Sequence, residues 1–320
     1  MQKNVLILAG GGGHTGYAFA LAQALHKKVK LSFLTPDGDS LSKNRLSKFG
    51  SVEFFVKPRH PKTSANIFIA LLAKAFINSV KLPIHDFDVV VSTGSNFCVP
   101  PALIARVRGV PTVNLESSVR FVKASRTALV LQPFSTLTAL QWEEQKRFLR
   151  NGMVVGPMLP KPEFKSWNGG YILVTGGTYG HRLLFDTLAK SSLPNIVLQT
   201  GRVSTEPYKK KHPEWKVIAS SDRFHELLAG AELVVTHFGM TLLEAAVYKK
   251  PVVLVPNPEW TLMAGMEDAR YLAKKLNAVL VSEIKTETLL DAINEAKSRK
   301  IPDLPDGAQN LANEIMKLAQ

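Results

Sequence analysis

The stretch NVLILAGGGGHTG at residues 4–16 decides the fold, because a short apolar run passes directly into four glycines and then His14. The run predicts a buried strand, and the apolar spacing of Thr15–Lys28 predicts a helix after it. Glycines between a strand and a helix tolerate positive φ angles and bring backbone N–H groups close to an anion, aided by the positive end of the helix dipole. The stretch therefore predicts a βα unit with an anion-binding turn.

Short β-rich runs continue to alternate with longer helical patterns. In the first half, strands are expected at Leu31–Thr35, Val52–Val56, Asp88–Ser92, Pro111–Leu115, Ala128–Leu131 and Met153–Val155, and helices at Ser40–Phe49, Ile67–Leu82, Val99–Arg108 and Leu140–Arg150. In the second half, strands are expected at Tyr171–Thr175, Asn195–Gln199, Trp215–Ile218, Leu233–Thr236, Val252–Val255 and Ala278–Val281, and helices at Arg182–Ser191, Phe224–Gly230, Thr241–Tyr248, Glu267–Leu276, Thr286–Ser298 and Ala308–Leu318. This alternation predicts parallel, doubly wound sheets.

Three prolines within Gly156–Pro162 interrupt the pattern, because proline neither continues a helix nor pairs in a central strand. We therefore expect an α/β chain of two doubly wound, Rossmann-like domains, residues 1–156 and 163–320. Ligands of such sheets bind at the carboxyl ends of the strands, so a cleft between the domains is the expected site.

The charge is divided unevenly along the chain. Residues 1–156 carry 20 Lys and Arg against 8 Asp and Glu, so they hold +12 of the net +14. This imbalance predicts an anionic partner for the first half, either a phospholipid surface or nucleic acid. The single cysteine, Cys98, excludes an intramolecular disulfide and suits a reducing compartment. We find no targeting-peptide pattern and no apolar run of about 18 residues that predicts a transmembrane helix.

Taken alone, Gly11–Gly16 fits the GxGxxG pattern of dinucleotide-binding domains, and Asp37 lies about where a ribose-binding acid falls. A dehydrogenase is therefore one rival. Four successive glycines followed by a histidine are unusual for that pattern, and a dehydrogenase has no need of a second domain with its own anion-binding turns. His14 stands at the mouth of the turn, where an imidazole of ordinary pKa, about 6.5, accepts a proton at neutral pH.

Several motifs together resemble a known family. Gly10–His14, Ser92–Ser95 and NLESSVR at 114–120 resemble the acceptor-side subunit of the eukaryotic dolichyl-diphosphate chitobiose synthase. VTGGT at 174–178, and THFG at 236–239 with LEA at 243–245, resemble its donor-side subunit. The whole chain is similar to the bacterial MurG-type enzyme, which adds GlcNAc to lipid-linked muropeptide, and a single chain with both halves resembles the archaeal relatives.

This resemblance implies the GT-B fold, with a polyprenyl- or dolichyl-diphosphate-linked sugar, expected to be GlcNAc, on the first domain and UDP-GlcNAc on the second. It implies an inverting, metal-independent GlcNAc transfer without a cofactor, in lipid-linked oligosaccharide synthesis for N-glycosylation. It also implies a peripheral enzyme on the cytoplasmic face of the cell membrane.

An inverting transfer is a single displacement, so it needs a base beside the acceptor hydroxyl and a stabiliser for the departing diphosphate. His14 and Glu116 both follow strands of the first domain, and we expect His14 to be the base with Glu116 as its competitor. Glu116 alternatively orients the acceptor sugar or His14. The predicted acceptor-binding residues are Gly12, Gly13, Thr93, Gly94, Ser95 and Arg120.

Donor-binding residues are expected at two turns of the second domain. Backbone N–H groups after Tyr171–Thr175 can stabilise the UDP phosphates in place of a metal ion, and Glu244 can accept the ribose hydroxyls. The predicted set is Gly176, Gly177, Thr178, His237, Gly239, Met240, Thr241, Glu244 and Glu267, with no metal site. The spacing from Gly239 to Glu244 is one position shorter than in many relatives, and MEDA at 266–269 replaces an element whose glutamine binds the donor sugar.

IFIALLAKAFI at 67–77 is an apolar segment that is accompanied by the basic residues Lys57, Arg59, His60, Lys62, Lys74 and Lys81. This pattern predicts an interfacial helix on an anionic membrane surface, with a helix buried on the sheet as the alternative. Three functional rivals stay open: a UDP-GlcNAc 2-epimerase, transfer of another sugar to a lipid-linked acceptor, and a non-catalytic lipid-carrier or nucleic-acid-binding protein. Nucleic-acid binding favours basic residues interleaved with aromatics, and we see no such stripe.

Overall fold

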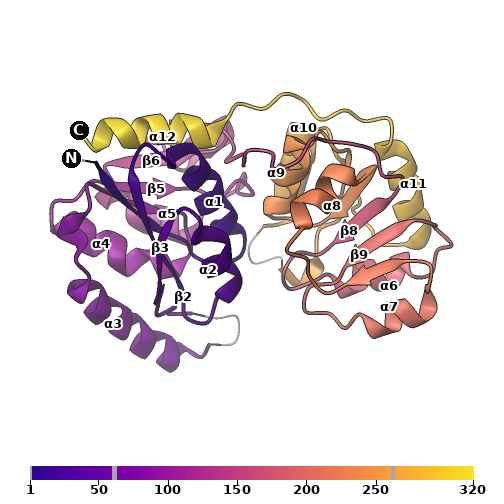
Figure 1. Ribbon diagram of the computed structural model, residues 1–320, viewed down its shortest axis with the longest axis horizontal. Helices are drawn as coiled ribbons and strands as arrows, with labels where there is room; N and C mark the ends of the chain where they lie inside the picture. Colours follow the sequence, from indigo (N-terminus) through magenta and orange to yellow (C-terminus); the bar gives the residue numbers. More distant parts are fainter. Residues whose placement is uncertain (1, 60–62, 261–263) are drawn as a thin grey trace. The chain divides into compact units, whose positions relative to one another are not determined.

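The computed structural model describes residues 2–59, 63–260 and 264–320, which form two compact units (Figure 1). The first unit comprises Met1–Pro160 and Leu304–Gln320, and the second comprises Lys161–Asp303. Each unit is an α/β fold around one parallel sheet, which confirms the predicted fold class. Within these residues no helix is long and apolar enough to cross a bilayer.

The first unit is built on a seven-stranded sheet in the order β3-β2-β1-β4-β5-β6-β7. Its strands are β1 (Asn4–Leu8), β2 (Lys30–Pro36), β3 (Gly50–Phe55), β4 (Val89–Ser92), β5 (Thr112–Leu115), β6 (Leu137–Leu140) and β7 (Met153–Val154). Leu8 at the end of β1 pairs with Leu34 of β2 and with Ser92 of β4. The turns that follow β1 and β4 therefore begin at the same level, which brings the Gly10–His14 turn beside residues 93–95.

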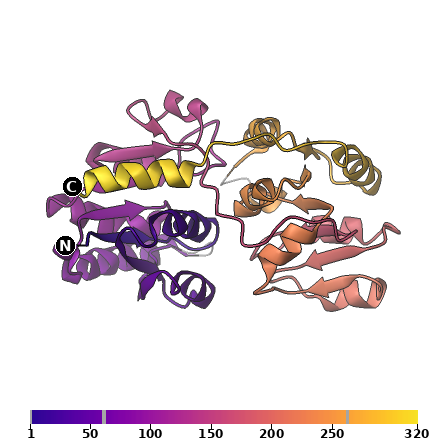
Figure 2. The same ribbon diagram turned by 45° about the horizontal axis from the view of Figure 1, so that its top comes forward.

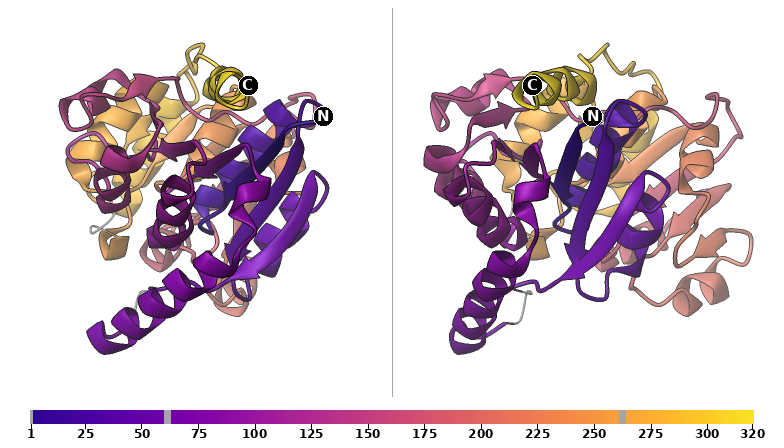
Figure 3. Two further views of the ribbon diagram at one scale, coloured as in Figure 1. Left: turned by 90° about the vertical axis from the view of Figure 1, so that its left-hand side faces the viewer. Right: turned by 60° about the vertical axis from the view of Figure 1, so that its left-hand side comes forward.

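Helices cover this sheet in two groups. The helices of the unit are α1 (Gly13–Leu25), α2 (Ser40–Leu46), α3 (Ala65–Lys81), α4 (Val99–Val107), α5 (Arg126–Leu131) and α12 (Gly307–Leu318), with 3-10 turns η1 (Ile84–Asp86), η2 (Asn96–Cys98), η3 (Gln132–Phe134) and η4 (Glu143–Arg147). α1 packs against α2 and α12, while α4 packs against α3 and α5. Figure 3 shows α3 extending outward from the body of the unit.

The C-terminal residues differ from the predicted domain division, which assigned all of 163–320 to the second domain. Residues 304–320 instead belong to the first unit, where Figure 2 shows α12 lying along it. Gly307 permits this path, because a Cβ there would collide with the Gly156 carbonyl oxygen. The N–H of Gly307 donates to the Pro157 carbonyl at 3.0 Å, and Asn310 Nδ2 donates to the Val155 carbonyl at 2.8 Å. The apolar face of α12 is buried through Ala308, Leu311, Ala312 and Ile315.

Two predicted elements of the first unit are wrong. Ala128–Leu131, predicted as a strand, belongs to α5, because the Ser125 hydroxyl accepts the Ala128 N–H at 3.1 Å and starts a helix there. The predicted helix Leu140–Arg150 is instead the end of β6 followed by η4. Leu140 pairs with Val154 of β7 and stays in the sheet, while the Gln145 side-chain oxygen accepts the N–H groups of Gln141 and Trp142 and so caps the later start of η4.

The second unit has a six-stranded sheet in the order β10-β9-β8-β11-β12-β13. Its elements are β8 (Ile172–Thr175), α6 (Arg182–Leu188), β9 (Ile196–Gln199), α7 (Glu206–Lys211), β10 (Lys216–Ile218), α8 (Phe224–Gly230), β11 (Leu233–Thr236), α9 (Met240–Val247), β12 (Val252–Leu254), η5 (Pro258–Trp260), α10 (Met266–Leu276), β13 (Val279–Leu280) and α11 (Thr286–Ala296). Thr175 pairs with Thr236 at the carboxyl ends of β8 and β11. The turns at 176–178 and 237–241 therefore lie next to each other.

Candidate functional site

His14 stands at the start of α1, and its ring lies over the end of β4. Its Nδ1 is 2.6 Å from the Thr93 carbonyl oxygen. A carbonyl only accepts, so Nδ1 carries the proton and Nε2 keeps its lone pair. Burial lowers the pKa of His14 to about 4, and the charges of Lys57 and Arg120 act in the same direction, against the Thr93 bond. At neutral pH the imidazole is therefore uncharged and its Nε2 can accept a proton.

The residues after β4 hold the His14 ring. A Cβ at Gly94 would lie 2.7 Å from His14 Cε1 and 2.9 Å from Nδ1, and Gly94 has a φ of +100°. The Thr93 side chain is buried, and its hydroxyl donates to the Leu8 carbonyl at 2.8 Å. Thr93 therefore contacts His14 through its backbone carbonyl and not through its side chain. Ser95 is half-buried. The predicted acceptor residues Thr93 and Gly94 are thus in direct contact with the predicted base.

The glycine turn before α1 is exposed to solvent. Gly12 and Gly13 are exposed, and a Cβ at either would meet no atom within 4 Å. Gly11 and Gly12 have φ angles of +86° and +58°, which glycine adopts without strain. Backbone N–H groups at the start of this helix are therefore placed to meet an anion.

Lys57 also reaches this turn, although the sequence pattern indicated it only as a flank of the apolar helix. It follows β3, and its Nζ donates to the Gly10 carbonyl at 3.1 Å. Burial lowers the pKa of Lys57, whereas the nearby Asp39 carboxylate raises it. The available signal was its position just past a strand end, where side chains gather at the functional edge of a parallel sheet.

Glu116 is buried beside this region, with an exposed fraction of 1%. Its Oε1 accepts the N–H of Ser117 at 2.6 Å, and its Oε2 accepts the N–H of Ser125 at 2.7 Å. Burial raises the pKa of Glu116, while these bonds and the Arg120 charge oppose the rise. Gln145 supports the same loop by donating to the carbonyls of Ser117 and Arg120. The Glu116 carboxylate therefore ties together the loop that carries Arg120.

The turn after β8 in the second unit is packed around glycines. A Cβ at Gly176 would collide with the backbone N of His181, and a Cβ at Gly201 would collide with the Gly177 carbonyl oxygen. Gly177 has a φ of +65°. Thr178, at the tip of the turn, is exposed. The predicted donor residues 176–178 therefore form a tight turn that presents its tip outward.

Two histidines, His181 and His237, meet beside this turn. Their rings are edge to face with centroids 6.1 Å apart. His181 is fully buried and its Nδ1 accepts the Leu184 N–H at 3.3 Å, which caps α6. Burial lowers the pKa of His181 and of His237 to about 4, and the charge of a protonated His237 lowers the pKa of His181 further in the same direction. His237 was predicted from its motif, whereas His181 was missed and only its place just after the glycine turn could have revealed it.

The second predicted donor element is the start of α9. Gly239, with a φ of +143°, precedes Met240 and the half-buried Thr241 at the helix N-terminus. Glu244 lies one turn further and is buried, with its Oε1 3.6 Å from His225 Nε2. Glu244 is thus near the predicted helix start but packed toward α8.

The last predicted donor residue, Glu267, is exposed in the first turn of α10. Its neighbour Asp268 is buried, and its Oδ2 accepts the Gly265 N–H at 2.9 Å. Asp268 therefore serves the helix start, and the predicted residue Glu267 is exposed to solvent.

The surface of α3 is mostly apolar and exposed. Ile67, Ile69, Ile77 and Val80 are each more than half exposed, and only Ala75 and Ser79 of the helix are buried. Lys74 and Lys81 on the same helix are exposed, as is Arg59, while His60 and Lys62 lie outside the described residues. The first unit carries 21 Lys and Arg against 10 Asp and Glu, so its net charge is +11.

Comparisons with known proteins agree with the resemblance. Residues 171–320 match the Glycosyltransferase family 28 C-terminal domain. The UDP-N-acetylglucosamine--N-acetylmuramyl-(pentapeptide) pyrophosphoryl-undecaprenol N-acetylglucosamine transferase of Parasynechococcus marenigrum is 27% identical to the chain, with 90% of this chain and 85% of the relative covered.

Solved structures show the same fold. MurG of Acinetobacter baumannii superposes with a TM-score of 0.66 at 18% identity, covering 100% of this chain and 99% of that chain. UDP-N-acetylglucosamine 2-epimerase of Rickettsia bellii superposes with a TM-score of 0.68 at 13% identity, covering 99% and 96%. These two structural similarities show the GT-B fold and do not indicate a particular activity. Residues 171–320 therefore match the family 28 C-terminal domain, and the chain as a whole has the GT-B fold and is similar to MurG.

Proposed function

We propose that the protein transfers GlcNAc from UDP-GlcNAc to a sugar that is linked through a diphosphate to a polyprenyl lipid. The observation that carries this proposal is the His14 arrangement, a neutral imidazole fixed on the Thr93 carbonyl at the open start of α1, with Lys57 beside it. The family 28 domain supports a sugar-donor site in the second half. The relative from Parasynechococcus marenigrum bears a name that pairs UDP-N-acetylglucosamine with a pyrophosphoryl-undecaprenol acceptor.

The proposed reaction is a single displacement with inversion. The acceptor hydroxyl oxygen attacks C1 of GlcNAc, the C1–O bond to the diphosphate breaks, and UDP leaves with the electron pair. The hydroxyl proton passes to Nε2 of His14. An anionic diphosphate bound nearby raises the pKa of His14 from about 4, because a negative charge favours the imidazolium. The base thus becomes stronger when the acceptor is in place.

Backbone N–H groups and basic side chains would hold the two diphosphates. On the acceptor side these are the N–H groups of Gly12 and Gly13, with Lys57 and Arg120 as counter-charges and Ser95 as a hydroxyl ligand. On the donor side, the proposed ligands of UDP-GlcNAc are Gly176, Gly177, Thr178, His237, Gly239, Met240, Thr241, Glu244 and Glu267. Glu244 would accept the ribose hydroxyls and Glu267 the hydroxyls of the sugar. This scheme needs no metal ion and no cofactor.

Glu116 is proposed as a positioning residue. Both of its carboxylate oxygens already accept a backbone N–H, so proton transfer to either would weaken a bond that shapes the loop around Arg120. Its contribution is therefore to place Arg120 near the acceptor diphosphate and near His14.

We also propose that α3 binds the cytoplasmic face of the cell membrane as a peripheral element. Its exposed isoleucines would enter the lipid interface, while Lys74, Lys81 and the +11 charge of the unit would attract anionic headgroups. A lipid-linked acceptor resides in that surface, so membrane contact would bring the glycine turn close to its substrate.

The decisive experiment incubates the full chain with radiolabelled UDP-GlcNAc and one of two acceptors, a polyprenyl-diphosphate-GlcNAc or a polyprenyl-diphosphate-muramyl pentapeptide. Label that becomes lipid-extractable supports the transfer. Use of the GlcNAc acceptor supports the N-glycosylation setting, and use of the muramyl acceptor assigns the protein to peptidoglycan synthesis. Conversion of UDP-GlcNAc to its 2-epimer, without a lipid product, would overturn the proposal in favour of an epimerase.

A further inference from the structure

A buried polar relay from Tyr248 through His225 reaches Glu244 in the second unit. Tyr248, directly after α9, and His225, in α8, are 2% and 9% exposed. The Tyr248 oxygen accepts the backbone N–H of Glu163 at 3.1 Å. Because this oxygen already accepts a backbone N–H, we assign the Tyr248 hydroxyl proton to the contact with His225 Nδ1, 3.3 Å away.

The tautomer of His225 follows from this contact. With Nδ1 as the acceptor, the ring proton of the neutral imidazole sits on Nε2. Nε2 lies 3.6 Å from Oε1 of Glu244, whose side chain is only 4% exposed. A carboxylate that is buried to this extent needs donors that offset its lost hydration. The His225 Nε2–H group lies close enough to the Glu244 carboxylate to interact with its charge.

We propose that His225, held by Tyr248, is a positioning residue that orients the Glu244 carboxylate toward the ribose hydroxyls of the donor nucleotide. This inference rests on the proposed function, in which Glu244 binds the ribose. A carboxylate with a fixed direction can accept both hydroxyls together, whereas 2′-deoxyribose offers only one of them. The preference for UDP over 2′-deoxy-UDP therefore measures how well Glu244 is oriented.

Isothermal titration of the full chain with UDP and with 2′-deoxy-UDP tests the relay. The wild type is expected to bind UDP roughly tenfold more tightly or better, the effect of one hydrogen bond to a charged group. Glu244→Gln and His225→Ala are each expected to reduce this ratio to below about threefold. His225→Gln retains a side-chain N–H that can reach Glu244, and we expect it to restore most of the ratio.

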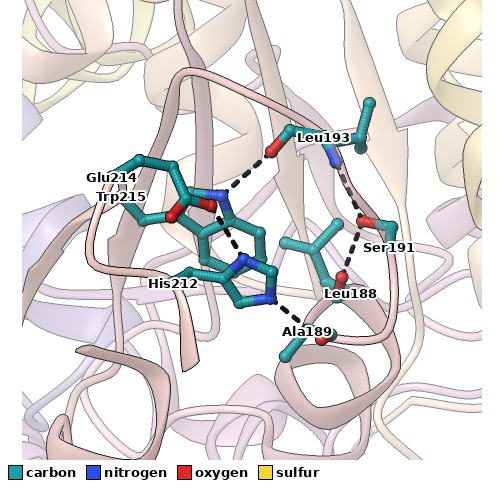
Figure 4. Close-up of polar contacts among 7 residues, drawn as sticks. All are labelled: Leu188, Ala189, Ser191, Leu193, His212, Glu214 and Trp215. Carbon is teal, nitrogen blue, oxygen red and sulfur yellow. Dashed lines mark hydrogen bonds and ion pairs between the residues drawn. The ribbon is translucent and has the colours of Figure 1, made fainter. Parts of the chain in front are cut away.

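His212 provides a matched control in the same unit (Figure 4). It is 8% exposed, its Nδ1 lies 2.9 Å from the Glu214 carboxylate, and its Nε2 lies 2.9 Å from the Ala189 carbonyl oxygen. His212→Gln removes an equally buried and hydrogen-bonded imidazole. It is expected to leave the UDP to 2′-deoxy-UDP ratio unchanged even where it lowers the melting temperature.

Each outcome separates the relay from the function on which it rests. A wild type that binds no UDP overturns the proposed donor site and the relay with it. A wild type without preference for UDP overturns the ribose role of Glu244. A ratio lost in Glu244→Gln but kept in His225→Ala overturns the relay alone. Should His225→Ala not fold, Tyr248→Phe decides, because it removes one hydroxyl and an unchanged ratio overturns the relay.

Discussion

Gly94→Ala tests whether the placement of the His14 ring controls the reaction. The new Cβ would lie 2.7 Å from His14 Cε1 and 2.9 Å from Nδ1, about 1 Å inside normal carbon contact. The ring must move by a similar amount, which breaks the 2.6 Å bond to the Thr93 carbonyl and frees the tautomer. Loss of an oriented base lowers the turnover number by about 10²- to 10⁴-fold. The positive φ of +100° adds strain of about 1–3 kcal/mol to the folded state.

Initial rates of GlcNAc transfer and thermal melting measure the two effects separately. Gly109→Ala is the matched control, because Gly109 also has a positive φ, +77°, but a Cβ there meets no atom within 4 Å. It should lose stability through strain yet keep its rate within about threefold. The double variant Gly94→Ala with His14→Ala should be no slower than His14→Ala, since both act on one group. A folded Gly94→Ala protein with near wild-type turnover would refute the reasoning.

Lys57 lies at the glycine turn, so Lys57→Met is expected to raise the KM for the acceptor about 10- to 100-fold through loss of a charged hydrogen bond to the acceptor diphosphate. The KM for the donor should stay unchanged, and the exposed control Lys28→Met should change neither KM. Equal shifts in both KM values would argue against an acceptor-side role. Ile69→Glu on exposed α3 is expected to weaken co-sedimentation with anionic vesicles roughly tenfold, since burying an isoleucine is worth about 1.5–3 kcal/mol, whereas Leu183→Glu, exposed on α6, should have no effect. Undiminished sedimentation of Ile69→Glu would remove α3 from the membrane contact. Burial lowers the pKa of His181 from 6.5 to about 4, so the unfolded chain binds more protons in that window and stability rises with pH across it, by up to about 3 kcal/mol. His181→Asn should flatten that part of the rise in urea denaturation between pH 4 and 7, and an unaltered slope would contradict the burial argument.

The alternation of strands and helices was predictable because each parallel strand is buried on both faces and leaves a short apolar run in the sequence. The two wrong elements fail for different reasons. The run after Ser125 is apolar and contains valine, so it looks like a strand, yet one serine hydroxyl at its start suffices to begin α5. Leu140 is held in the sheet by its pairing with Val154, and the Gln145 side chain caps η4 only from Trp142 onward.

No local sequence pattern indicated which of the two units α12 belongs to. Its apolar spacing predicts that one face is buried, but the same face would suit a partner in either unit. The choice is made by Gly307 and Asn310, which bond the backbone at Pro157 and Val155. These contacts join residues far apart in the sequence, and a pattern read along the chain carries no information about them.

At the candidate site, the sequence indicated which turns carry the chemistry but not which atoms serve it. Thr93 was predicted as an acceptor ligand, yet its hydroxyl is committed to the Leu8 carbonyl and its own carbonyl fixes His14. Lys57 reaches the glycine turn because β3 pairs with β2 and β2 with β1, an order that only the folded sheet defines. His181 lies beside the site because the turn packs tightly around Gly176, and the sequence pattern did not indicate this packing.

The proposed base also makes a prediction about pH that distinguishes the empty from the occupied site. Without acceptor, burial holds the pKa of His14 near 4, so the base is weak. A bound diphosphate raises this pKa, because its charge favours the imidazolium. The acidic limb of kcat/KM for the acceptor reports the enzyme before the acceptor binds and should fall near pH 4, whereas the limb of kcat reports the complex and should lie higher. A Glu116 base would also titrate higher in the complex, because an added anion would raise a pKa that burial already raises, so the His14→Gln variant is needed to separate the two. The His14→Gln variant must lose both limbs, and if its remaining activity keeps the same two limbs, His14 is not the group that takes the proton.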